Sequence, residues 1–121
     1  MAKILFVEND PTDVARFTRI VKQELGHNMG FADSVQAAEF ALLNNEFDLI
    51  ICTETVGSLG DGVAFAERLV NQGRKVCLYS TSLNSPHLTS IKKEHVYGID
   101  HYLAVEITKE LATNPARRDT P

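Results

Sequence analysis

Three apolar segments of this chain end in short polar groups whose residue types could hold a cation or contact a phosphoryl group. The polar groups are Glu8-Asn9-Asp10, Thr53-Glu54 and Ser80-Thr81, and each follows a run of apolar, mostly β-favouring residues. If those runs are strands of one parallel sheet, their carboxyl ends meet at one edge, which is where such sheets bind ligands. We therefore expect these side chains to converge on one site.

The elements that must position these groups alternate short apolar runs with helical patterns, as successive βα units do. The predicted strands cover residues 3–7, 28–32, 49–52, 75–80 and 101–105. The helices predicted between and after them begin near residues 11, 35, 62, 86 and 107. This pattern predicts an α/β fold, a flavodoxin-like doubly wound sheet of five parallel strands in the order 2-1-3-4-5 between two helix layers.

Local signals mark where several of these helices begin and end. Asp10 can cap a helix that starts at Pro11, because proline suits the first helical position. Gly26 is the expected stop of that helix, and Ser34 the expected cap of the next. Pro86 is expected to open a short fourth helix, with Leu88 and Ile91 on one side.

The bulk composition limits the classes of function. A chain of 121 residues is one domain, and a net charge of −4 disfavours a nucleic-acid partner. No run approaches the ~20 apolar residues of a membrane span, and Cys52 and Cys77 have no metal-type spacing. We predict a cytoplasmic domain over residues 1–113, with 114–121 as a linker or disordered tail that could lead to an effector domain.

Taken together, these motifs resemble the receiver domain of bacterial response regulators, over about residues 3–106. Glu8 matches the first of the family's two acids, and Asp61-Gly62 matches the Asp-Gly that follows the phosphoacceptor. Residues 98–103 read Gly-Ile-Asp-His-Tyr-Leu, close to the family's Gly-Ala-Asp-x-Tyr-Leu. The resemblance implies an aspartate acceptor ending the third strand, a lysine after the fifth strand, and Mg²⁺ held by the two acids. It also implies that Ser80 and Tyr102 form the switch pair.

The chain departs from this pattern at the positions that would carry phosphotransfer. Counting from the strand start puts Thr53 at the acceptor position, whereas counting back from Asp61-Gly62 puts Glu54 there. Neither residue is an aspartate, and a threonine hydroxyl cannot form an acyl phosphate. Val105 stands where the resemblance places the lysine. The phosphoacceptor position is therefore expected to be degenerate, and the pairing lysine to be missing.

The acidic pocket is also altered. Asn9 replaces the second acid, and an amide oxygen is a poorer Mg²⁺ ligand because it brings no charge. Asp10 could substitute, although capping the following helix is its simpler role. We expect no cofactor, and at most a weak Mg²⁺ site at Glu8 and Asp10.

The pattern therefore predicts a pseudo-receiver: a non-enzymatic, phosphorylation-independent protein-interaction module of two-component (phosphorelay) signalling. The expected partner surface is the face of the fourth helix, fifth strand and fifth helix, covering residues 85–94, 101–103 and the segment from Ile107. One alternative is a working receiver that uses Glu8, Asp10 and Glu54 as its acids. Another is a flavodoxin-like ligand-binding domain, in which the loop over residues 57–62 would contact a small molecule in the strand-end cleft.

Overall fold

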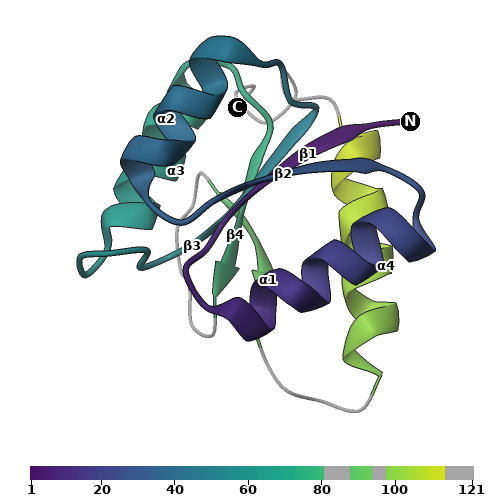
Figure 1. The fold of residues 1–121 in the computed structure, drawn as a ribbon. Helices are drawn as coiled ribbons and strands as arrows, with labels where there is room; N and C mark the ends of the chain where they lie inside the picture. The colour runs from purple at the N-terminus through teal and green to yellow at the C-terminus, as the bar shows by residue number, and fades with distance from the viewer. Residues whose placement is uncertain (81–87, 94–97, 114–121) are drawn as a thin grey trace.

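The chain forms a five-stranded parallel sheet with helices on both faces (Figure 1). The computed structural model describes residues 1–80, 88–93 and 98–113. The strands are β1 (Lys3–Val7), β2 (Asn28–Ala32), β3 (Leu49–Thr53), β4 (Val76–Ser80) and β5 (Thr89–Lys92). The helices are α1 (Pro11–Thr18), its π-helical continuation η1 (Arg19–Glu24), α2 (Val35–Asn44), α3 (Asp61–Asn71) and α4 (Ile99–Ala112). The strand order is β2-β1-β3-β4-β5, which confirms the predicted order.

Successive side chains of the central strands point to opposite faces of the sheet and pack into two separate hydrophobic cores. In β1, Leu5 and Val7 point to one side and Ile4 and Phe6 to the other, and all four are fully buried. Figure 1 shows α2 and α3 covering the first side and α1 and α4 the second. A strand covered on both faces needs apolar residues at every position, which is why these segments read as continuous apolar runs.

Three of the predicted helix signals, at Asp10, Ser34 and Gly26, are confirmed. The Asp10 carboxylate accepts a hydrogen bond from the Thr12 backbone N–H at 2.9 Å, which caps α1. The Ser34 hydroxyl accepts one from the Ala37 N–H at 3.0 Å and caps α2. Gly26 follows η1 with a φ of 71°, a left-handed conformation that glycine adopts without steric cost. Asp10 and Ser34 thus mark where α1 and α2 begin, and Gly26 marks where the chain leaves η1 for β2.

The prediction of a fourth helix near Pro86 and of a strand over residues 101–105 is wrong. Residues Thr89–Lys92 form β5, which pairs in parallel with β4, whereas residues 101–105 lie within α4. The predicted fifth helix from Ile107 is the second half of α4. Residues 81–87, where the fourth helix was expected to begin, lie outside the described residues.

The packing explains this exchange. Leu103 and Ile107, four positions apart, are both fully buried against the α1 side of the sheet, which is a helical repeat. In β5 only Ile91 is buried, as befits a strand at the sheet edge. The β-favouring run of residues 101–105 was thus a local preference that the longer helical repeat overrides.

The ends of the chain bear on two further predictions. Residues 114–121, expected to be a linker or disordered tail, lie outside the described residues. Among the residues that are described, no helix combines the length and apolar character that a membrane crossing requires.

Candidate functional site

The carboxyl ends of four strands meet at one edge of the sheet, as expected from the sequence. Glu8 directly follows β1, Thr53 ends β3 and Ser80 ends β4, and each is only 2% exposed. Lys93 directly follows β5, and its backbone N–H donates to the Ser80 carbonyl at 2.9 Å. The strand order therefore brings three buried residues, an acid and two that carry hydroxyls, to the same end of the sheet as Lys93, whose side chain is 27% exposed.

Lys93 is the centre of this cluster. Its ammonium donates to Glu8 Oε2 at 3.0 Å and to Thr53 Oγ1 at 3.4 Å. It also lies 3.5 Å from Asp13 Oδ2 and 5.3 Å from the centre of the Tyr79 ring. One cation thus contacts two carboxylates, a hydroxyl and an aromatic face.

The Glu8 carboxylate is fully engaged by the protein itself. While Oε2 accepts from Lys93, Oε1 accepts from the backbone N–H groups of Asn9 at 3.0 Å and Asp10 at 3.3 Å. A carboxylate that is 2% exposed needs such partners, because an unpaired buried charge is costly. The side chain is therefore held in one geometry by β1, the start of α1 and Lys93.

Asp13, on the first turn of α1, adds a second buried carboxylate. Its Oδ1 accepts from the Tyr79 hydroxyl and from an Arg16 guanidinium nitrogen, each at 3.1 Å. Burial, together with the negative charge of Asp13, raises the pKa of Tyr79, so this phenol remains a proton donor at neutral pH. The polar network therefore runs from α1 through β4 to Lys93.

The acids that surround Lys93 fix its charge. Burial alone would lower the pKa of Lys93, but the hydrogen bond and charge of Glu8, helped by Asp13, outweigh it and raise that pKa above its usual value. The side chain is therefore an ammonium at neutral pH, and its charge is balanced by carboxylates of the same chain.

The loop after β3 shows which residue reaches the cluster. Thr53, and not Glu54, places its side chain beside Lys93. A Cβ on Gly62 would lie 1.8 Å from the Thr53 carbonyl oxygen, so only glycine lets α3 start this close to β3. The Glu54 carbonyl accepts from the Gly62 N–H at 3.1 Å, which fastens α3 to the strand end.

Asp61 closes the same loop. Its carboxylate accepts from the N–H groups of Val56 at 2.7 Å and of Gly57 and Ser58, both at 3.1 Å. Burial acts to raise the pKa of Asp61, but these backbone hydrogen bonds outweigh it and hold the pKa below its usual value. The N–H groups that could cradle a phosphate are thus already bound to the loop's own carboxylate.

The residues expected to hold Mg²⁺ do not fit that role. Asn9 donates its side-chain N–H to the Val56 carbonyl, Asp10 caps α1, and both Glu8 oxygens are already bonded. Within the described parts of the chain, no three His, Cys, Asp or Glu residues are grouped so as to hold a metal ion. The Mg²⁺ site implied by the resemblance is therefore not reproduced by these donors.

Two predicted site positions need correction. Val105 does not stand at the lysine position, because it lies in α4, where it is 37% exposed, and Lys93 fills the strand end instead. Tyr102 also lies in α4 and not on a strand. Its hydroxyl nevertheless accepts from the Lys92 N–H at 2.9 Å, and Lys92 is the register partner of Ser80.

Sequence reasoning missed Lys93 and Asp13. Lys93 was missed because residues 88–93 were assigned to a helix, although the β-branched Thr89 and Ile91 alternate with the polar Ser90 and Lys92. Asp13 resembled an ordinary acid in a first helical turn, where it favours the helix dipole. Its position three residues after the Asp10 cap, next to the apolar stripe of α1, was the available signal.

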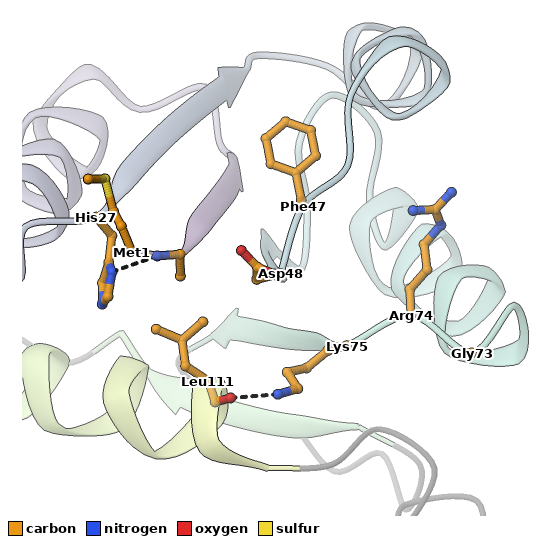
Figure 2. A pocket seen from close by; sticks show the side chains of 9 residues that line it. Met1, His27, Phe47, Asp48, Gly73, Arg74, Lys75 and Leu111 are labelled. Atoms are coloured by element: carbon orange, nitrogen blue, oxygen red, sulfur yellow. Dashed lines mark hydrogen bonds between the residues drawn. The ribbon is translucent and has the colours of Figure 1, made fainter.

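An open hollow of about 700 Å³ lies at the opposite edge of the sheet (Figure 2). It is lined by residues at the amino ends of the strands, among them Ala2, His27 and Lys75, and by Leu111 of α4. The Lys75 ammonium donates to the Leu111 carbonyl at 2.7 Å, and the Ala2 N–H donates to His27 Nδ1 at 3.0 Å. This hollow shares no residue with the Lys93 cluster.

No protein-family model and no curated protein sequence matches this chain. Solved structures do match it. A receiver domain of a histidine kinase from Syntrophus aciditrophicus is 23% identical, with a TM-score of 0.76 over 93% of this chain and 91% of that one. A CheY-like response-regulator receiver domain from Methanospirillum hungatei JF-1 is 16% identical, with a TM-score of 0.79 over 97% and 98%.

A third match extends the same similarity. The receiver domain of an HD domain-containing protein from Pseudomonas fluorescens Pf-5 is 18% identical, with a TM-score of 0.79 over 99% of this chain and 93% of that one. The chain therefore has the fold of the response-regulator receiver domain, and the resemblance read from the sequence is confirmed at the level of the fold.

Proposed function

We propose that this chain is a receiver-like signalling module that binds a protein partner without being phosphorylated. The observation that carries this proposal is the pairing of Lys93 with Glu8 and Asp13. The resemblance to receivers gives a lysine at the fifth strand end the task of pairing with a phosphoryl group. Here that cation is already neutralised by buried acids of the chain.

The residue beside Lys93 supports the same proposal. Thr53 carries a hydroxyl where an aspartate carboxylate would accept the phosphoryl group. A hydroxyl with no adjacent general base is a weak nucleophile, and both carboxylates nearby are held by Lys93 and other donors. The cluster thus has the charge balance of a closed structural network, and we assign the module no catalytic activity of its own.

The partner surface that we propose is the exposed side of β5 and the adjoining part of α4. Thr89, Ser90 and Lys92 of β5 are exposed at the sheet edge, and Val105 of α4 is 37% exposed. Tyr102 ties the two elements together through its hydrogen bond to Lys92. Because the Lys93 cluster holds the end of β5, this surface keeps one shape without a phosphoryl signal.

The test is an amide NMR spectrum of the whole chain, recorded before and after addition of Mg²⁺ and beryllofluoride, which mimics a bound phosphoryl group. The proposal predicts unchanged resonances for Glu8, Thr53, Ser80 and Lys93. Saturable shifts at these four residues would contradict it and favour the alternative of a working receiver with unusual acids.

A further inference from the structure

Helix α2 keeps two large apolar side chains in solvent. Phe40 is 69% exposed and Leu43 is 84% exposed, and a spacing of three residues puts them on the same side of the helix. Leu43 also lines a hollow of about 280 Å³ between α2 and α3. The other lining residues are the apolar Leu42, Phe65 and Leu69 and the polar Glu39, Arg68, Gln72 and Arg74. Single exposed apolar residues are common, but two exposed apolar side chains at a hollow with apolar and charged walls are typical of an interaction surface.

Charges of both signs border this surface. Glu39 of α2 and Arg68 of α3 form an ion pair at the border of the hollow, with 3.0 Å between Oε1 and a guanidinium nitrogen, and Arg74 adds a second positive side chain to the lining. Each side chain is 54% exposed, so both remain accessible to a second molecule. A partner of one charge would meet repulsion on one side, whereas a second copy turned by a twofold axis presents Arg68 to Glu39 and Glu39 to Arg68.

We propose that α2 and α3 form the interface of a symmetric dimer of this chain, in which Phe40 of each copy enters the hollow between α2 and α3 of the other. In a twofold arrangement, Phe40 of each copy is buried and the hollow of each copy is filled. Aromatic side chains that fill a partner's pocket commonly dominate the binding energy of such interfaces. The surface lies across the sheet from α4, so the dimer leaves the proposed partner surface free (Figure 1).

The first test is the mass of the full chain by sedimentation equilibrium, over concentrations up to about 1 mM. We expect a reversible dimer whose dissociation constant rises at least about tenfold in Phe40→Asp. Leu59→Asp is the matched control, because Leu59 is an apolar side chain that is 97% exposed outside this surface. A wild-type chain that stays monomeric throughout, or a Phe40→Asp variant that dimerises like wild type, overturns the proposal.

The second test uses the paired charges. Glu39→Arg leaves only arginines as charged residues lining the hollow, and Arg68→Glu leaves two glutamates against Arg74, so each variant alone should repel its own copies. Mixed together, they should form a heterodimer at least as readily as the wild type forms its dimer. If the mixture associates no better than either variant alone, Glu39 and Arg68 do not face one another across an interface. Both tests measure only whether chains associate with one another. Their failure would therefore leave the proposal on phosphorylation unaffected.

Discussion

The Lys93 ammonium lies 3.0 Å from the Glu8 carboxylate, although the two residues stand 85 positions apart in the chain. β3 and β4 separate their strands in the sheet, so the long lysine side chain crosses the strand ends to reach β1. Thr53 and Asp13 lie along the same path. This contact ties the first and last strands together and completes the charge balance of the cluster.

Replacing Lys93 by methionine should destabilise the fold, because the buried Glu8 carboxylate would lose its cation and Asp13 would keep only Arg16 as a cation. We expect a loss of roughly 2 kcal/mol in the free energy of unfolding, below the usual range for broken buried pairs because Lys93 keeps some contact with water. Urea unfolding measures it. Lys92→Met is the matched control, since its neighbour Lys92 is exposed, and equal stability of the two variants would argue against the Lys93 contact.

The structure places a strand at Thr89–Lys92 and a helix at Ile99–Ala112, the reverse of what the sequence pattern predicted, and NMR can check this directly. Backbone carbon chemical shifts should be helical throughout Ile99–Ala112 and extended over Thr89–Lys92. The physical reason is the burial of Leu103 and Ile107 at helical spacing. Strand-like shifts over residues 101–105 would return Val105 to the lysine position and remove Lys93 from the cluster.

This part of the chain shows where sequence reasoning reached its limit. Strands β1, β3 and β4 lie where the pattern predicted them, because each is buried on both faces and so carries a continuous apolar run. β2 was also predicted, although it is an edge strand in which only Ala32 is buried. β5 is an edge strand with one buried residue, Ile91, and leaves almost no such signal. Because residues 98–103 resemble a receiver motif, the fifth strand was predicted there and not at Thr89–Lys92. The predicted strand order was nevertheless correct.

Gly62→Ala should be among the most damaging small changes to this chain. The added methyl would meet the Thr53 carbonyl oxygen at 1.8 Å, which forces β3 and α3 apart. We expect a loss of about 3 kcal/mol or more, at the upper end for overpacking because backbone cannot yield as a side chain can. In the same loop, an alanine at Gly57 would make only an ordinary contact of 3.7 Å with Asp61, so Gly57→Ala should be far milder in the same unfolding experiment.

Asp61 should make the stability of the chain depend on pH in the acid range. Its pKa is lower in the folded chain than in the unfolded chain, so its contribution is present above the unfolded value, about 4, and is lost as the pH falls through the folded value. The difference in unfolding free energy between wild type and Asp61→Asn should therefore be constant near neutral pH and shrink as the pH falls below about 4. A difference for Asp61→Asn that stays constant as the pH falls would contradict the hydrogen-bonded carboxylate.

The site was partly predictable for a related reason. Glu8, Thr53 and Ser80 follow strongly apolar strands, so their convergence at one sheet edge could be inferred from the sequence alone. The roles of Asp13 and Lys93 depend on which way α1 faces and where β5 lies, and neither is encoded in a local motif. The charge balance of the cluster is therefore a property of the tertiary structure.

The central claim is our proposal that this receiver-like fold accepts no phosphoryl group. Lys93 is paired with Glu8 and Asp13, and neither Thr53 nor Asn9 supplies a carboxylate that would compete for it. Intact mass after incubation with acetyl phosphate and Mg²⁺ tests it, with the wild type and the double variant Thr53→Asp, Asn9→Asp treated side by side. The new aspartate at position 53 could attack phosphorus through a carboxylate oxygen and release acetate, whereas the threonine lacks that carboxylate. The claim predicts an unmodified wild type and a labile phosphoryl adduct on the double variant. An adduct on the wild type, or none on the double variant, would contradict it.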